Sequence, residues 1–484
     1  MESKGSNALL VRTRNAEGAR LDPNAVSALQ TRLQGPLLRT SDSGYSEAIR
    51  IWNGMIDKRP ALVVQPTGSA DVVEAVKFAR ENRLPLSVKG GGHNIAGTAL
   101  ADGGVTLDMS RMRRIDVDPQ TRTARVGPGC RLRDVDRETQ AHGLATVLGF
   151  VSDTGVAGLT LGGGVGYLAR RFGWTVDNLL EVEIVTPDGE IRRANPRAHE
   201  DLFWAVRGGG GNFGVVTEFV YRLHEVGPEI AGGLLAWPAE EREQVQVALE
   251  AYRDVTGTAP RELTVFCTLQ RAPSAPFVPV EWRGRRAAVF LVCHTGPPER
   301  VKDDLAPLTG ALGPPIVDLL RRRPYTEQQS LVDATQPDGM HNYWKSDWAA
   351  ELSDGLLTAM RDLSLENPIP MGQIGFLHVG GALNERAPDD GAVGNRDARF
   401  ALGALGMWAP NDPAEERYRT WIRQAWSAFR PFSTGGAYVN FLTEDEGEDR
   451  VRDAYGANLT RLTQVKRRYD PENLMHVNKN IKPA

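Results

Sequence analysis

The clustering of glycine constrains this chain more than any other feature of its sequence. Of its 484 residues 51 are glycine, and 23 of these fall within the 125 positions from Gly90 to Gly214. Glycine has no side chain, so it permits tight turns and lets two backbones, or a backbone and a ligand, approach closely. We therefore expect loops in this window whose main chain forms part of a binding site.

Composition and charge exclude several classes of protein. The 57 Lys and Arg nearly balance the 61 Asp and Glu, and the net charge of −4 gives no sign of nucleic acid or an anionic membrane as a partner. The three cysteines (Cys130, Cys267, Cys293) exclude a disulfide scaffold and any CxxC pair, and we expect no metal. There is no apolar membrane-spanning segment and no secretory signal. We expect a cytoplasmic protein with a small-molecule substrate, as a monomer or small homo-oligomer.

The first 225 residues predict short strands mixed with helices. Ala61–Gln65 predicts a strand, Ser69–Asn82 a helix capped by Ser69, and Leu86–Val88 a second strand, which together form a β-α-β unit. The same reasoning predicts a turn at Asp116–Pro119 and a helix at Arg131–His142. It predicts further strands at Val105–Asp108, Thr123–Val126, Leu179–Val185, Ile191–Arg193 and Val215–Leu223.

The pattern changes at Pro228–Pro238, which we interpret as a domain boundary. Beyond it, long strand-like runs alternate with long helix-like runs, a pattern typical of an antiparallel sheet with helices on one face. The predicted strands are Leu263–Leu269, Arg286–His294, Ile374–Gly380 and Arg399–Trp408. The predicted helices are Ala239–Val255, Ala349–Leu363, Ala414–Phe429 and, near the end of the chain, Asp449–Tyr469.

Three glycine-rich motifs are candidates for the binding site. In Val88–Asn94, three glycines directly after a strand expose backbone N–H groups suited to a pyrophosphate, and the loop then delivers His93 either to a cofactor or to the structure. Thr154–Gly166 follows a loop rather than a strand, which argues against a Rossmann turn. Leu202–Val216 ends a helix with four glycines, either as a packed crossover or as a further contact. Two such loops far apart favour one long cofactor.

The order and spacing of these motifs resemble the FAD-linked oxidoreductases of the vanillyl-alcohol-oxidase/PCMH superfamily, in particular the berberine-bridge-enzyme-like branch. The resemblance covers nearly the whole chain. It rests on Gln65-Pro66, Lys89–Asn94, Asp108–Ser110, Gly155–Gly166, Asp177-Asn178, Asp201–Val216, Tyr343–Lys345, Tyr438–Asn440, Tyr469–Leu474 and Asn478–Ile481.

The resemblance implies an α+β fold with a PCMH-type FAD-binding domain in two parts. An inserted substrate domain, built on an antiparallel sheet backed by helices, separates the parts. The expected bounds are 1–228 for the first part, 229–435 for the substrate domain, and 436–484 for the C-terminal segment that returns to the FAD domain.

The resemblance also implies FAD with a single covalent link through His93. Members with a second link carry a cysteine near the place of Val151-Ser152, where this chain has none; Cys130 lies about twenty residues too early. Gly158–Thr160 departs from the Gly-Gly-His frequent in the family, which fits the singly linked members. The implied cofactor-binding residues are His93, Lys89, Gly90, Gly91, Gly92, Asn94, Gly97, Thr154, Gly155, Gly158, Thr160, Gly162, Gly163, Gly164, Gly166, Asn178, Val216, Asn440, Asn478 and Asn480.

For catalysis the resemblance places a substrate sheet over the flavin, with Tyr343, Gln373, His378 and Tyr438 as candidates and Asp390 near the place of a catalytic glutamate. Tyr438 is the first choice for the proton acceptor, with a packing role as the alternative. The implied function is an oxidase that transfers hydride from a natural-product intermediate, sugar or amine to FAD and then to O2. A dehydrogenase with another acceptor and a non-catalytic flavin-binding protein remain alternatives.

Overall fold

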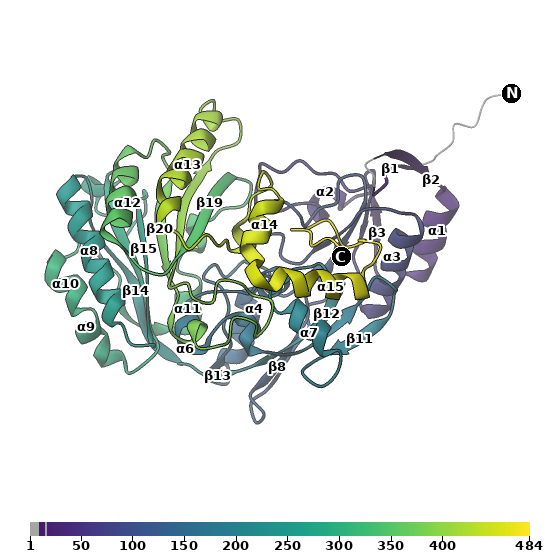
Figure 1. Cartoon of the computed structure of the whole chain (residues 1–484), viewed down its shortest axis with the longest axis horizontal. Coiled ribbons are helices and arrows are strands. Elements are labelled where there is room, and N and C mark those ends of the chain that lie inside the picture. Colours follow the sequence, from purple (N-terminus) through teal and green to yellow (C-terminus); the bar gives the residue numbers. More distant parts are fainter. Residues whose placement is uncertain (1–8, 15–16) are drawn as a thin grey trace.

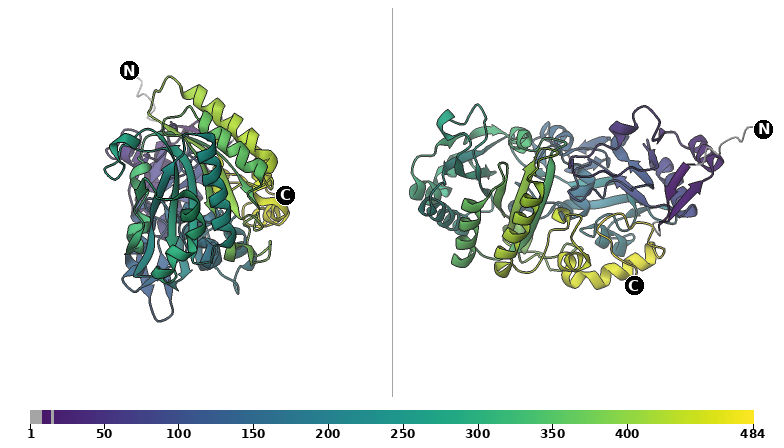
Figure 2. Two further views of the ribbon diagram at one scale, coloured as in Figure 1. Left: turned by 90° about the vertical axis from the view of Figure 1, so that its left-hand side faces the viewer. Right: turned by 90° about the horizontal axis from the view of Figure 1, so that it is seen from above.

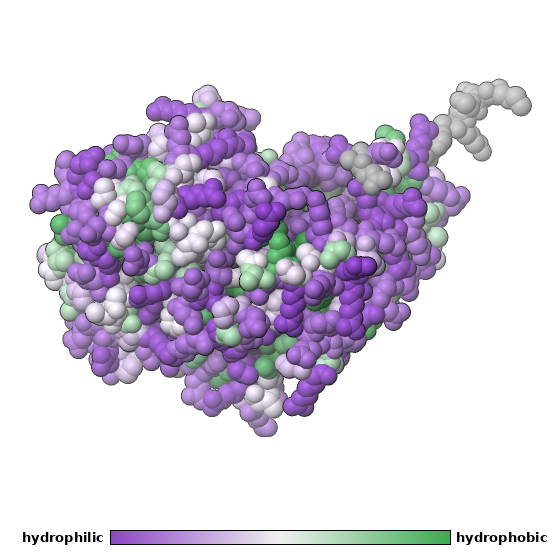
Figure 3. Space-filling model, viewed as in Figure 1, coloured by the Kyte–Doolittle hydropathy of each residue, from purple (hydrophilic) through white to green (hydrophobic). Residues whose placement is uncertain are grey.

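A computed structural model describes residues 9–14 and 17–484. The expected absence of a secretory signal concerns the N-terminal stretch, of which residues 1–8 and 15–16 lie outside the described part. The molecule is elongated, with several small sheets toward one end and one large sheet toward the other (Figure 1). Among the described residues, no helix has the length and apolar character to cross a membrane. The face in Figure 3 is mostly hydrophilic, with small scattered apolar areas.

A four-stranded sheet carries the first glycine loop. Its order is β3 (Leu37–Arg39), β4 (Leu62–Val64), β6 (Val105–Asp108) and β5 (Leu86–Lys89). The predicted β-α-β unit is present, with β4 and β5 joined through α3 (Ser69–Glu81), but both strands pair in parallel with β6 between them. Ser69 does not cap α3 as expected: the cap is Gly68, and the Ser69 hydroxyl donates to Glu183 at 2.6 Å.

A five-stranded antiparallel sheet lies beside it, in the order β11 (Ile191–Ala194), β10 (Leu179–Val185), β12 (Val215–Arg222), β8 (Thr123–Val126) and β7 (Ile115–Asp118). The turn expected at Asp116–Pro119 is wrong in place, because Ile115–Asp118 forms β7 and half-buries its apolar side chains. The helices near this sheet are α4 (Leu132–Gln140), α5 (Val156–Leu161), α6 (Ala169–Phe172) and α7 (Glu200–Val206). Two short pairs complete this end: β1 (Leu9–Arg12) with β2 (Gly18–Leu21), and β9 (Leu144–Ala145) with β13 (His224–Glu225).

The large sheet is antiparallel and has eight strands. Its order is β17 (Val317–Asp318), β14 (Glu229–Pro238), β16 (Arg286–His294), β15 (Leu263–Arg271), β20 (Gln373–His378), β21 (Phe400–Trp408) and β19 (His341–Ala349), with β18 (Arg321–Pro324) also on β14. The stretch expected as a boundary is β14 itself, whose apolar residues pair along the whole of β16. Ala349 ends a strand instead of starting a helix, and α12 (Asp354–Glu366) begins after the Ser353 cap.

Helices cover one face of the large sheet. α8 (Arg242–Thr258), α10 (Ala306–Leu312), α12 and α13 (Glu415–Phe429) lie side by side on that face, where their apolar residues and those of the strands form the largest core (Figures 1 and 2). The opposite face contacts the glycine-rich segment 145–176 through a second, aromatic core. The mixed helix and sheet class expected from the sequence is confirmed, and the sheet joins the glycine loops through its uncovered face.

The chain ends against the small sheets. The single helix expected at Asp449–Tyr469 is two, α14 (Glu448–Tyr455) and α15 (Leu459–Tyr469), because Gly456 takes a left-handed conformation with φ of +51° between them. Beyond α15 the backbone returns to the four-stranded sheet, where Leu474 and Met475 are buried in its core. This path brings the C-terminal segment beside the glycine loops (Figure 1).

Candidate active site

The first two glycine motifs contact each other through their backbones. A Cβ atom on Gly91 would lie 2.4 Å from both the amide nitrogen and the Cα of Gly155. Gly155 is the N-cap residue of α5, so the first glycine loop lies against a helix N-terminus. Gly92 and Gly97 have φ of +72° and +65°, a conformation that favours glycine. The close approach of the two backbones therefore requires glycine at 91 and 155, and the positive φ favours glycine at 92 and 97.

His93 leaves this loop and stacks on Trp52. The two ring centroids are 4.4 Å apart and the planes differ by 11°. Burial lowers the pKa of His93 to about 4, so its imidazole is neutral near pH 7 and keeps a free nitrogen lone pair. Trp52 in turn donates its indole N–H to the carbonyl of Gln336 at 3.1 Å. No sequence pattern points to Trp52, which lies in a stretch without helical or strand periodicity.

Two further residues of the first motif hold the loop itself. Lys89 is buried and donates to the carbonyl of Ala48 at 2.7 Å, with the carboxylate of Asp108 3.5 Å away. Asn94 Oδ1 accepts the backbone N–H of Ala96 and both the N–H and the hydroxyl of Thr98, each at 3.1 Å. Both side chains are occupied by the protein, so any contribution they make to binding is through the shape of the loop.

The second motif meets the C-terminal segment. A Cβ on Gly162 would lie 2.1 Å from the side-chain oxygen of Asn440, and the N–H of Gly164 donates to the Tyr438 hydroxyl at 3.1 Å. Gly163 and Gly164 have φ of +117° and +78°. Residues almost 300 positions apart thus share one surface, as the resemblance implies.

Three of the expected cofactor residues have side chains that contact the core. The Thr160 hydroxyl contacts the Tyr221 hydroxyl at 2.7 Å, and Asn178 Nδ2 donates to the carbonyl of Trp174 at 2.9 Å. Val216, the second residue of β12, is buried. These side chains support the glycine-rich segment.

The third glycine run binds the C-terminal segment through Asn212. Asn212 Oδ1 accepts the N–H of Ile481 at 2.9 Å and its Nδ2 donates to the carbonyl of Lys479 at 3.2 Å, while Asn478 Nδ2 donates to the carbonyl of Gly211 at 3.1 Å. The oxygens of Asn478 and Asn480 are buried and have no hydrogen-bond partner in the described chain. Buried polar atoms without partners are rare, so these oxygens fit a polar ligand.

Tyr438 lies in an aromatic cluster at the junction of the large sheet and the glycine loops. Its ring is 5.8 Å from both Trp174 and Trp348 and 4.8 Å from Phe441. It precedes a short 3-10 turn and does not lie in a strand, whereas its burial in the aromatic core leaves the packing role open as an alternative. Burial raises the pKa of Tyr438 to about 12, although hydrogen bonds from Asn440 and Gly164 oppose that rise.

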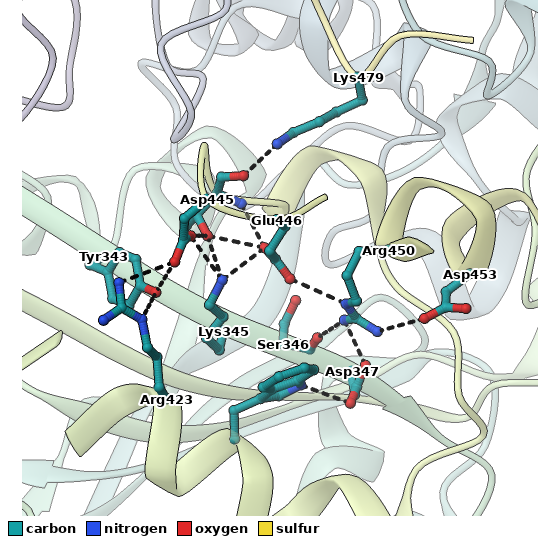
Figure 4. Close-up of polar contacts among 12 residues, drawn as sticks. Tyr343, Lys345, Ser346, Asp347, Arg423, Asp445, Glu446, Arg450, Asp453 and Lys479 are labelled. Atoms are coloured by element: carbon teal, nitrogen blue, oxygen red, sulfur yellow. Dashed lines mark hydrogen bonds and ion pairs between the residues drawn. The ribbon is translucent and has the colours of Figure 1, made fainter. Parts of the chain in front are cut away.

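Tyr343 lies on the helix-covered side of the large sheet, away from Tyr438. Its hydroxyl donates to Asp445 at 2.6 Å and accepts from Arg423 of α13 at 2.9 Å, within the polar network of Figure 4. Burial and the Asp445 carboxylate raise the pKa of Tyr343. The neighbouring residue Trp344 points to the opposite face, because side chains alternate along a strand.

His378 is on the helix-covered side as well. It stacks on Phe400 with ring centroids 5.5 Å apart, and its Nε2 is 2.6 Å from a guanidinium nitrogen of Arg170. Burial, with help from that guanidinium, lowers the pKa of His378 well below its usual value. Gln373, five residues earlier on β20, lies on the uncovered face.

Asp390 lies in the connection between β20 and β21, and its carboxylate contacts two arginines. Arg207 is 2.9 Å away and Arg386 is 2.7 Å away. Burial acts to raise the pKa of Asp390, but the two arginines outweigh it and the pKa is lowered. Asp390 is therefore ionised, and it shares both arginines with the buried carboxylate of Asp177.

The residues present fit an elongated cofactor with polar groups along its length. Backbone N–H groups are presented at glycines where a Cβ would collide, a neutral imidazole lies at one loop, and unpartnered amide oxygens lie at the C-terminal segment. The indole N–H of Trp174 and the hydroxyl of Thr175, beside the second glycine motif, are also buried without partners in the described chain. Among the described residues, no group of three or more His, Cys, Asp or Glu could hold a metal ion.

Comparison with known proteins defines the class of this protein. The FAD binding domain family matches residues 60–195, and the family described as "Berberine and berberine like" matches residues 437–482. The chain is 31% identical to (R)-6-hydroxynicotine oxidase of Paenarthrobacter nicotinovorans, over 93% of this chain and 97% of that protein. It is 30% identical to an FAD-linked oxidoreductase of Dictyostelium discoideum, over 93% and 95%.

Solved structures agree with this classification. The crystal structure of 6-hydroxy-D-nicotine oxidase from Arthrobacter nicotinovorans superimposes with a TM-score of 0.83 at 29% identity, covering 93% of this chain and 98% of that one. Berberine bridge enzyme from Eschscholzia californica gives a TM-score of 0.85 at 18% identity, over 95% and 99%, and so shares the fold. The protein is a flavin-dependent enzyme of the PCMH type. It belongs to the berberine-bridge-enzyme-like family of FAD-linked oxidoreductases.

Proposed function

We propose that this oxidoreductase is an oxidase that holds FAD through one covalent link to His93. The observation that supports the proposal is that His93, the first two glycine motifs and Tyr438 lie together on the uncovered side of the large sheet, while Asn478 binds the third glycine run. The similarity to a relative named for oxidase activity, (R)-6-hydroxynicotine oxidase, supports the oxidase assignment. We further propose the domain division 1–228, 229–435 and 436–484, because the large sheet is built wholly from residues 229–408.

The chemistry that FAD supplies, when bound, is the acceptance of a hydride from a substrate carbon and the passing of two electrons to O2. In the net reaction the substrate loses a hydride from carbon and a proton from the adjoining oxygen or nitrogen. Molecular oxygen takes up both electrons and both hydrogens as hydrogen peroxide. The chain must therefore hold the cofactor, orient the substrate carbon and accept a proton.

His93 is suited to attachment because its imidazole is neutral and held in place. A pKa of about 4 leaves a lone pair available throughout the neutral range, and the stack on Trp52 fixes the ring plane. Cys130 is buried, and burial raises its pKa to about 12, so it is a thiol rather than a reactive thiolate. Cys130 is therefore no donor for a second, thioether link, and the sequence has no cysteine near Val151-Ser152, where such a donor is expected.

The decisive experiment asks whether flavin is attached and whether it turns over. We expect acid precipitation of the yellow protein to leave the flavin in the pellet, and His93→Ala to release FAD to the supernatant or yield apoprotein. Cys130→Ser is the matched control and should keep the attachment. Anaerobic reduction followed by readmission of air should restore the oxidised spectrum within seconds and release hydrogen peroxide.

Each result has a definite meaning for the proposal. Freely extractable flavin in the unmodified protein contradicts the covalent link. Slow reoxidation by air with fast reoxidation by a quinone or dye would identify a dehydrogenase. A bound flavin that no substrate reduces, in a protein that dithionite reduces, would identify a flavin-binding protein without turnover.

A further inference from the structure

Charge is segregated between the two faces of the large sheet. On β19, Lys345 and Asp347 point to the helix-covered side, where Asp445, Glu446 and Arg450 neutralise them (Figure 4). The intervening residues Trp344, Ser346 and Trp348 point to the other face, toward the glycine loops.

The same separation holds on the neighbouring strands. On β21, β20, β15 and β16, no Asp, Glu, Lys, Arg or His in these described strands points to the face shared with Trp344. Histidines and arginines at the strand ends, such as His378 and Arg286, alternate to the helix-covered side. The uncovered face carries Ala401, Gly403, Leu405, Met407, Gln373, Gly375, Leu377, Thr264, Phe266, Thr268, Gln270, Ala287, Val289, Leu291 and Cys293.

One row across this face combines an aromatic ring with two amides. Trp344 pairs with Leu405, Leu405 with Gln373, and Gln373 with Gln270. Neighbouring strands lie about 4.8 Å apart, so the row spans roughly 14 Å. All four side chains are half-buried. Gln373 makes no side-chain hydrogen bond within the described chain, and Gln270 only accepts one, from Thr268 at 3.3 Å.

Gly375, in the next row, has no structural need to be glycine. A Cβ there would meet only Thr268 at 3.5 Å, the Cys267 carbonyl at 3.7 Å and Leu405 at 3.8 Å, all ordinary contacts. Glycine inside a strand weakens it, and it commonly marks a place where a ligand approaches closely. Gly403 is its partner across the strand pair.

Aromatic contacts place this row beside His93. Trp344 is 5.4 Å from Trp52, which stacks on His93 at 4.4 Å. On its other side Trp344 meets Phe441 edge to face at 5.5 Å, and Phe441 contacts Tyr438. The row therefore begins at the proposed cofactor attachment point and runs away from it across the sheet.

We propose that this face selects an uncharged, flat, ring-containing substrate that lies over Gly375, with a ring against Trp344 and hydroxyl or carbonyl groups bonded by Gln373 and Gln270. The proposal rests on the proposed function and names its substrate class. An ammonium or carboxylate on this face would lose its hydration and find no counter-charge on the sheet. Amide side chains both donate and accept hydrogen bonds, so they can bind uncharged hydroxyl and carbonyl oxygens. The leucines of this face pack favourably against ring carbons but offer no hydrogen bonds to the hydroxyl groups of a sugar.

The test compares three naphthalene probes of similar size, which differ in charge, and one uncharged disaccharide on the flavin-loaded protein. We expect isothermal titration calorimetry to give 2-naphthol a Kd at least tenfold lower than 2-naphthoate, 2-naphthylmethylamine or cellobiose, with a change in the flavin absorption spectrum on binding. A charged probe or cellobiose that binds as tightly as 2-naphthol would overturn the proposal.

Substitutions locate the binding. Gln373→Leu should weaken 2-naphthol at least fivefold, whereas Gln424→Leu, an exposed glutamine on α13, should not change it. Gly375→Val should abolish 2-naphthol binding with the flavin content unchanged, because the protein has room there for a side chain. Gln373→Glu should raise affinity for 2-naphthylmethylamine at least tenfold.

Failure of this inference is separable from failure of the proposed function. The substrate class alone is refuted if the protein is yellow, is reduced by dithionite and reoxidised by air, and binds 2-naphthol equally well after Gln373→Leu and Gly375→Val. A colourless protein that still prefers 2-naphthol in calorimetry, with the same response to these variants, refutes the flavoenzyme proposal alone.

Discussion

The phenol oxygen of Tyr438 accepts hydrogen bonds from the Gly164 amide at 3.1 Å and from Asn440 Nδ2 at 3.0 Å. Two donors stabilise a phenolate, but the loss of hydration on burial outweighs them and raises the pKa of Tyr438 to about 12. A proton acceptor with this pKa is almost fully protonated at pH 7. If Tyr438 accepts the substrate proton, only the small deprotonated fraction is active, and that fraction grows with pH.

We therefore expect flavin reduction by substrate to accelerate about tenfold per pH unit between pH 7 and 10, without a plateau. Tyr438→Phe removes one hydroxyl, so it should keep fold and flavin, slow reduction by roughly 10²–10⁴-fold and abolish that slope. Reoxidation by O2 should change little. Stopped-flow absorbance separates the two half-reactions, with Tyr418→Phe as the control. If flavin reduction in Tyr438→Phe is as fast as in the unmodified protein, Tyr438 only lines the site and does not accept the proton.

At the residue level, sequence reasoning identifies backbone requirements better than side-chain directions. The glycines at 91, 155 and 164 have geometric needs that any chain in this arrangement must meet. The direction of Tyr343 depends on which face of β19 the helices cover, and this is decided by partners far away in the sequence. Trp52 escapes prediction because its role is a contact with a loop forty residues later.

At the element level, the predicted strands with strong apolar runs are present within one or two residues. β16 and β10 match their expected bounds. β19 was not expected because Lys345 and Asp347 interrupt its apolar pattern, and both are buried only because Arg450 and the 443–446 turn supply counter-charges. β14 was not expected because Gly232 and Gly233 are typical of a linker, and only pairing with β16 makes the segment a strand.

The contact between the first loop and α5 predicts a sharp effect of one methyl group. Gly91→Ala places a Cβ 2.4 Å from the Gly155 backbone, so the loop must separate from the helix N-terminus. We expect a loss of about 1–3 kcal/mol in the free energy of unfolding and a flavin content below half of normal. Urea unfolding and the ratio of flavin to protein absorbance measure these two effects.

The matched control is Gly257→Ala in α8, where an added Cβ meets nothing within 4 Å. An exposed helical position of this kind should gain about 0.5–1 kcal/mol and leave the flavin content unchanged. Equal stability and flavin content in both variants would show that the loop and helix tolerate separation.

At the scale of the whole molecule, one polar network joins the large sheet to the C-terminal segment. Lys345 of β19 pairs with Asp445 and Glu446, and Lys479 donates to the carbonyl of Thr443 in the same turn (Figure 4). Burial lowers the pKa of Lys479 to about 8. The sheet that bears the proposed substrate face and the segment that bears Asn478 and Asn480 are therefore tied through residues 443–446.

The C-terminal segment also completes a buried ion pair. Lys466 and Asp470 lie 2.7 Å apart with both side chains fully buried, and Asp470 accepts the N–H groups of Leu474 and Met475 at 2.8 Å. Removing one partner of such a pair typically costs about 3–5 kcal/mol. A chain that ends before Asp470 would leave the Lys466 ammonium without a counter-ion and expose the core that Leu474 and Met475 cover.

We therefore expect deletion of residues 470–484 to abolish flavin incorporation, with a melting temperature well below that of the full chain. Because that variant loses fold and ligands together, the double substitution Asn478→Ala and Asn480→Ala separates the two effects. It keeps the ion pair and the apolar contacts and removes only the two hydrogen bonds that Asn478 Nδ2 donates to Gly211 and Met475, so circular dichroism should stay near normal and melting should fall far less than in the deletion, while flavin content falls at least fivefold. Deletion of residues 482–484, beyond the buried Ile481, is the control and should retain flavin. Stoichiometric FAD in the 470–484 deletion would show that the first two glycine motifs hold the cofactor without the returning segment.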